Sequence, residues 1–158
     1  MIKKTPTIAA IRKQLAITEP SELLTLCLDL AKFKKENKEL LGYLLFDSAD
    51  LTQYISDIKA HNEDAFGHLN TSNYYLMKKG IRKILRNTKK YIKFTRNKQA
   101  EVELLTHFCL QMQSLSPSIF KNATLNNLYI RQQHLIVKLV DAFHEDLQYD
   151  YQQLIRQL

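Results

Sequence analysis

The 158-residue sequence contains few residues that interrupt helices, with only three Gly and three Pro. Such scarcity favours long helices joined by short connections. No internal stretch shows the sustained alternation of apolar and polar residues that is typical of a half-buried strand. We therefore expect an all-α fold of six to eight antiparallel helices, stacked as helical hairpins in the manner of an α-solenoid. An irregular helical bundle is the alternative, because no repeat of fixed period is visible.

Long apolar runs are also missing. The longest extends from Leu40 to Phe46, seven residues, whereas a helix needs about 20 apolar residues to cross a bilayer. Near the start of the chain, Arg12 and Lys13 interrupt the apolar pattern before it reaches the length of a secretory signal. We therefore expect a cytoplasmic protein with no signal peptide and no transmembrane segment. The length of the chain favours a single domain over residues 1–158.

Cysteine is rare as well. Cys27 and Cys109 each lie within an apolar helical pattern, and we expect both to be buried free thiols rather than a disulfide pair. Neither has a Cys or His neighbour at the spacing of metal ligands. The sequence also lacks a Gly-rich phosphate loop and a Ser nucleophile flanked by Gly. These absences argue against the familiar catalytic motifs, so we expect no cofactor and place an enzymatic function third among the interpretations.

Acidic residues are absent from one segment of an otherwise balanced chain. Residues 71–100 hold ten Lys or Arg and no Asp or Glu. Residues 1–70 hold nine basic and ten acidic residues, and residues 101–158 hold four basic and six acidic residues. The net charge of +7 therefore comes from a single segment rather than from the general composition.

This segment has the period of an amphipathic helix, which we expect over residues 72–96 with Thr71 or Ser72 as its N-cap. At 100° per residue, its apolar residues fall on one side and its charged residues on the other. Tyr75 and Phe94 lie on or beside the charged side. We call the charged side the basic face, and it comprises Lys78, Lys79, Arg82, Lys83, Arg86, Lys89, Lys90, Lys93 and Arg96.

The basic face supports several interpretations, because like charges at this spacing repel one another and an anion would relieve that repulsion. One is a non-enzymatic module that binds a polyanion, above all nucleic acid, with Lys and Arg on phosphates and Tyr75 and Phe94 stacked on unpaired bases. A second is a protein-interaction scaffold that docks an acidic partner protein. The face could also be a solvated surface neutralised in part by acidic neighbours, or could contact an anionic membrane peripherally.

A second group of residues has the spacing of a metal site. Asp57, His61, Asp64 and His68 follow one another at intervals of four, three and four residues, which places them on one face of a continuous helix. Carboxylates and imidazoles are sound ligands for a transition metal. However, Asp–His pairs four residues apart are also ordinary partners on a helix surface. We expect such pairing here, no bound metal, and a solvated acidic patch at residues 141–146.

Apolar content suggests how the remaining helices pack. Residues 20–33 are apolar over more than half of the helical circumference, so we expect them among the least exposed of the chain. Residues 118–158 contain no Pro or Gly. They predict either one long helix or two helices separated near Tyr149 and Asp150.

The run KFKKENKELLGYLLF at residues 32–46, followed by TSNYY at residues 71–75 and the Lys- and Arg-rich helix, resembles a group of small all-helical bacterial proteins. The resemblance spans most of the chain. It implies a compact helical fold and brings no activity with it.

Overall fold

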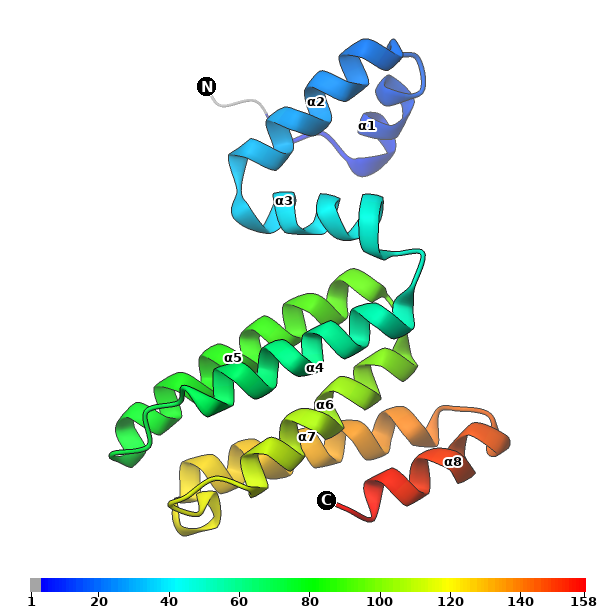
Figure 1. Cartoon of the computed structure of the whole chain (residues 1–158). Coiled ribbons are helices and arrows are strands. Elements are labelled where there is room, and N and C mark those ends of the chain that lie inside the picture. Colours follow the sequence, from blue (N-terminus) through cyan, green and yellow to red (C-terminus); the bar gives the residue numbers. More distant parts are fainter. Residues whose placement is uncertain (1–3) are drawn as a thin grey trace. The chain divides into compact units, whose positions relative to one another are not determined.

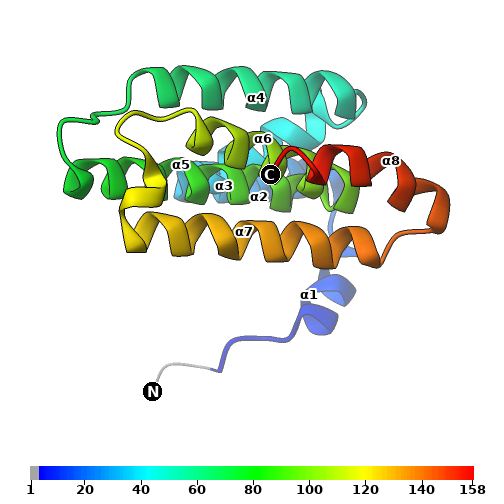
Figure 2. The same ribbon diagram turned by 90° about the horizontal axis from the view of Figure 1, so that it is seen from below.

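A computed structural model describes residues 4–158, and every regular element in that range is helical, as predicted. Figure 1 and Figure 2 show the chain in two views. In chain order the elements are α1 (Ile8–Leu15), α2 (Pro20–Phe33), α3 (Lys35–Gly42), a π-helical turn (Tyr43–Asp47), α4 (Leu51–Gly67), α5 (Tyr74–Thr95), α6 (Lys98–Gln113), a 3-10 turn (Ile119–Lys121), α7 (Ala123–Asp141) and α8 (Glu145–Ile155).

The chain divides into two compact units, which we call the N-terminal unit (Met1–Phe46) and the C-terminal unit (Asp47–Leu158). The prediction of a single domain over residues 1–158 stays a prediction. The basic face lies on α5, and therefore within the C-terminal unit.

In the N-terminal unit, the expectation that residues 20–33 are deeply enclosed is wrong. No residue of α2 is buried, and Leu24 and Phe33 are 62% and 81% exposed. Apolar residues do occupy more than half of the circumference of α2, but a helix is enclosed only if neighbouring segments cover every side of it. Within this unit α2 packs against the short helix α3, which leaves much of its circumference uncovered. Cys27 is exposed for the same reason, contrary to the prediction.

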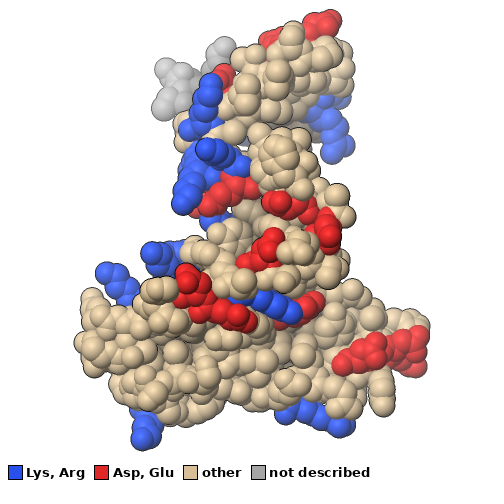
Figure 3. Space-filling view, viewed as in Figure 1, with Lys and Arg blue, Asp and Glu red and all other residues tan. Residues whose placement is uncertain are grey.

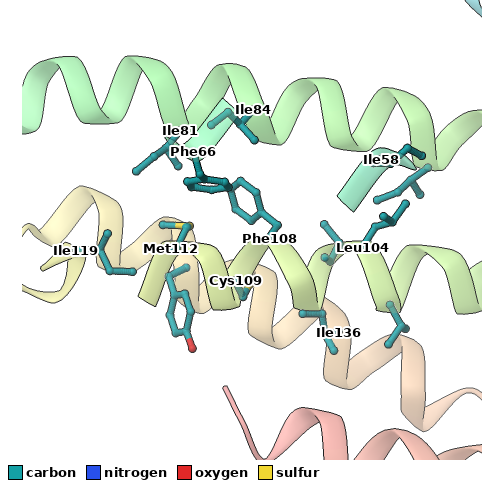
Figure 4. Packing of buried hydrophobic residues seen from close by; sticks show 14 of the residues in the cluster. Ile58, Phe66, Ile81, Ile84, Leu104, Phe108, Cys109, Met112, Ile119 and Ile136 are labelled. Atoms are coloured by element: carbon teal, nitrogen blue, oxygen red, sulfur yellow. The ribbon is translucent and has the colours of Figure 1, made fainter. Parts of the chain in front are cut away.

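The core of the C-terminal unit is built around α6, which contacts α4, α5 and α7. Consecutive helices of this unit run antiparallel (Figure 1), and α4 and α7 lie on opposite sides of α6 (Figure 2). Buried residues occur around most of α6, including Leu104, Phe108 and Met112. The rings of Phe66 and Phe108 lie 5.5 Å apart between α4 and α6 (Figure 4). Cys109 is buried in this core, as predicted.

Helices α4, α5, α6 and α7 each begin at an asparagine or aspartate side chain that satisfies an otherwise unpaired backbone N–H group. Asp50 accepts from the backbone of Gln53 at the start of α4. The cap of α5 is Asn73, which accepts from Leu76 at 2.9 Å, so the expected cap at Thr71 or Ser72 is wrong by one or two residues.

Residues 118–158 form two helices, but the break lies between Asp141 and Glu145 rather than near Tyr149. The side-chain amide of Gln148 donates to the carbonyl oxygens of Asp141 and Phe143, at 3.1 and 2.8 Å. These bonds satisfy acceptors that an uninterrupted helix would have paired with its own backbone. The break is therefore stabilised by a residue of the following helix, which composition alone does not reveal.

Candidate nucleic-acid interface

The orientation of α5 is fixed by what it buries. Met77, Ile81 and Ile84 belong to the apolar core of the C-terminal unit, and α5 contacts both α4 and α6. Farther along the same side, Thr88 is fully buried and accepts a hydrogen bond of 3.0 Å from the amide of Asn62 on α4. Because these contacts hold one side of α5 against the core, the opposite side faces outward.

Most of the basic face is exposed in consequence. Lys78 and Lys90 are half-buried, whereas the other members have exposed side chains, namely Lys79, Arg82, Lys83, Arg86, Lys89, Lys93 and Arg96. The structure thus confirms that this helix separates its core residues from its charged residues. Arg96 ends the helix in the left-handed conformation with φ of 50°, a region that non-glycine residues seldom adopt.

Acidic neighbours do not pair with the exposed members of this face. In the part of the chain that the structure describes, ion pairs occur elsewhere, such as Lys59 with Glu103 and Lys98 with Glu101 at 2.8 Å. Within residues 4–158, none involves an exposed side chain of the basic face. Acidic side chains gather instead over the middle of the C-terminal unit, on the side where α4 lies in front of α5 (Figure 3). Neutralisation by ion pairs, one of the sequence-based alternatives, is therefore not observed for these residues.

Lys90 differs from the rest of the basic face. Its side chain is half-buried, and its ammonium nitrogen lies 4.8 Å from the centre of the Tyr91 ring. At this distance the ring attracts the cation. Lys90 is accordingly more constrained than its neighbours.

The two aromatic residues assigned to the basic face have different surroundings. Tyr75 is 72% exposed near the start of α5, where its ring is free to stack on a ligand. Phe94 is only 9% exposed, and its ring lies 6.2 Å from that of Tyr91. Its assignment as a base-stacking residue is therefore wrong. A helical wheel records the position of a residue on its own helix, whereas burial depends on the segments that pack over it.

The four residues with metal-site spacing pair with near neighbours instead. Asp57 accepts from the amide of Gln53 at 2.8 Å, and His68 lies 3.3 Å from Asp64. His61 contacts the ring of Tyr91 edge-on. Among residues 4–158, no three His, Cys, Asp or Glu side chains are placed to hold a metal ion. The arrangement is that of surface pairs on α4, and the hypothesis of a metal-dependent reaction has no support from it.

A groove beside the basic face includes residues that sequence reasoning missed. This α5–α7 groove has a volume of about 520 Å³ and takes Arg82, Leu85 and Lys89 from α5. Its other wall is one side of α7, with Thr124, Asn127, Leu128, Arg131, Gln132 and Leu135. The three- and four-residue spacing of that wall is visible in the sequence. Nothing in the sequence shows that it faces α5.

Two findings bear on the wider identity of the chain. Within residues 4–158, none of the helices combines the length and apolar character that crossing a membrane requires. Comparison with models of protein families, with curated proteins and with solved structures yields no match to this chain. The resemblance to small helical bacterial proteins therefore stays a prediction.

Proposed function

We propose that the protein is a non-enzymatic module that binds nucleic acid through the basic face of α5. The observation that carries the proposal is a row of exposed Lys and Arg side chains, on a helix anchored by its opposite side, with no ion pairs of their own among the described residues. Lys and Arg contacts to phosphates supply affinity without regard to sequence, because they release condensed counterions.

The spacing of the charges suits a phosphate backbone. From Lys79 to Lys93 the basic face follows α5 for about 21 Å, at 1.5 Å per residue. Charged residues recur at every turn along this length, so that several phosphates of one strand can be contacted together. Since α5 is held by buried contacts with α4 and α6, the backbone that carries this row is in place before a ligand binds, and binding has to order only the side chains.

Tyr75 supports a preference for single strands. Its exposed ring lies near the start of the basic face, and it borders a surface hollow that is otherwise lined by Lys78, Lys79, Arg82, Lys83 and Arg86. A base that stacks on this ring would place its phosphate among those cations. Stacking on aromatic side chains contributes about 1–3 kcal/mol per base and requires an unpaired base.

The competing proposal is a scaffold that docks an acidic partner protein on the same face. Both proposals use the same positive charge, but they differ in the ligand that a simple experiment detects. Nucleic acid should bind with a strong dependence on salt, whatever its sequence. An acidic protein partner predicts no appreciable oligonucleotide affinity even at low ionic strength.

The deciding experiment measures the affinity for random single-stranded and duplex oligonucleotides by fluorescence anisotropy at several salt concentrations. The triple variant Lys79→Gln, Lys83→Gln and Arg86→Gln removes three charges from the basic face. A matched control, Lys121→Gln, Lys138→Gln and Arg156→Gln, removes the same charges from exposed positions outside that face.

We expect log affinity to fall with log salt, with a slope of about −0.7 per phosphate contacted for a single strand. The first variant should flatten the slope by up to about 2, whereas the control should leave it nearly unchanged. Absence of oligonucleotide binding at low salt would refute the proposal in favour of the acidic partner. Equal effects of the two variants would show that net charge, rather than this face, attracts the ligand.

A further inference from the structure

The α5–α7 groove brings together three cations from two helices. Arg82 and Lys89 come from α5 and Arg131 comes from α7, and no Asp or Glu is among the residues that line the groove. All three side chains are exposed, and none forms an ion pair within the described residues. Like charges placed around one hollow repel one another, and a single anionic group between them would relieve this repulsion.

The groove also contains groups that suit the organic part of a ligand. Leu85, Leu128 and Leu135 give it apolar surface, and Asn127 adds an exposed side-chain amide. A volume of about 520 Å³ lies within the range of small-molecule sites, which usually combine apolar walls with a few polar groups. A bare inorganic anion would leave this apolar surface unused.

An unpaired oxygen on Gln132 indicates which groups a ligand of this groove should carry. Gln132 is 5% exposed, and its amide nitrogen donates to the carbonyl oxygen of Leu128 at 3.2 Å. Its side-chain oxygen is buried and has no hydrogen-bond partner among the described residues. Buried acceptors are nearly always paired, so a missing donor is an observation that needs an explanation. The amino group of a base is such a donor.

From these observations we propose that the α5–α7 groove binds one nucleotide. Arg82, Lys89 and Arg131 hold its phosphate, and the leucines pack against its base. The exposed amide of Asn127 binds the edge of the base with both its oxygen and its N–H, the bidentate geometry by which an amide recognises adenine, and the oxygen of Gln132 acts only as an acceptor for an amino group. The nucleotide is either free or part of a single strand, since both present the same phosphate and base. If the nucleotide is part of a single strand, the inference rests on the proposed function. The groove would then extend the basic face, because Arg82 and Lys89 belong to both.

The test uses the full chain and measures binding of adenosine monophosphate, uridine monophosphate and inorganic phosphate by titration calorimetry. We expect adenosine monophosphate to bind more tightly than uridine monophosphate, which has no exocyclic amine, and more tightly than phosphate. Arg131→Gln should weaken nucleotide binding about ten-fold, as expected for a charged hydrogen bond. Arg156→Gln removes the same charge outside the groove and should change nothing. Asn127→Ala, at an exposed position, should reduce the preference for adenine while keeping the fold.

The outcomes separate this inference from the proposed function. Binding of the mononucleotide without oligonucleotide affinity would support the groove as a site for a free nucleotide and would refute the proposed function. A second outcome is that no mononucleotide binds, while the Arg131 and Arg156 variants bind oligonucleotides equally and with the same dependence on salt. That outcome would overturn the nucleotide site in the groove and leave the proposed function intact. Equal affinity for phosphate and for both nucleotides would overturn the assignment of a base site.

Discussion

The side-chain amide of Asn62 on α4 donates a hydrogen bond of 3.0 Å to the hydroxyl of Thr88 on α5, and both residues are 1% exposed or less. The Thr88 hydroxyl also lies 3.0 Å from the carbonyl oxygen of Ile84, one turn earlier in the same helix. Apolar contacts around this pair are not directional, whereas a hydrogen bond has a narrow geometry. We infer that the pair defines the rotation of α5 about its axis, and with it the outward direction of the basic face.

Removing both members of this pair should cost less than the sum of the two single removals. Thr88→Val leaves the buried amide of Asn62 without its partner, which should lower the free energy of unfolding by about 1–3 kcal/mol. Adding Asn62→Leu to this variant removes the unpaired group, so the double variant should lose less than the sum of the single changes, with a coupling of about 1 kcal/mol. Urea denaturation of the unchanged protein, the two single variants and the double variant measures this coupling. Strictly additive losses would contradict the role assigned to the pair.

Tyr75 and Phe94 should behave as opposites when each is replaced by Ala. Tyr75→Ala should leave stability nearly unchanged, because the side chain is 72% exposed, and should weaken single-strand binding by about 1 kcal/mol or more through lost stacking. Phe94→Ala should instead lower the free energy of unfolding by about 3 kcal/mol, because it empties a buried site. Thermal unfolding measures the stability of the two variants, and fluorescence anisotropy measures their affinity for single-stranded oligonucleotides. A stable Phe94→Ala protein with a specific loss of single-strand binding would reverse our assignment.

Cys109 should make stability depend on pH in the alkaline range. Burial raises the pKa of its thiol from 9.0 to about 12. In the unfolded chain the thiol ionises near pH 9, while in the folded protein it stays neutral to about pH 12. Its contribution is therefore complete below pH 9 and is lost as the pH rises from 9 to 12, by up to about 1.4 kcal/mol per pH unit.

The measurement is urea denaturation across this pH range, with Cys109→Ala as the comparison. That variant should lose baseline stability but show a shallower fall with pH. Burial also raises the pKa of Tyr129 and of Tyr151, and their contributions have the same sign and remain in both proteins. An identical pH dependence with and without the Cys109 thiol would show that it ionises freely in the folded state, and hence that it is not buried.

Several features were predictable because they depend on a few neighbouring residues. The spacing of apolar and charged residues in residues 72–96 predicted both the helix and its two faces, since the helical period relates sequence distance to direction. The same local signals separated exposed Tyr75 from the core.

Other features depended on which helices meet, and for these the sequence was a poor guide. It predicted that residues 20–33 are among the least exposed, whereas α6 is the enclosed helix, because α4, α5 and α7 surround it. Phe94 was assigned to the charged side of its helix and is buried. Arg131 lies in a segment of ordinary composition and lines a groove with Arg82 and Lys89, more than 40 residues away along the chain.

The sequence by itself therefore determined that the chain is helical and that one of its helices carries a concentrated positive charge. Those properties follow from hydrogen bonds and side-chain directions within a few turns. Only the tertiary structure decided that α6 forms the centre of the core, that the exposed cations of α5 form no ion pairs with other residues of 4–158, and that α7 adds a third cation and two amides beside them. These depend on contacts between distant segments, which helical periodicity does not encode.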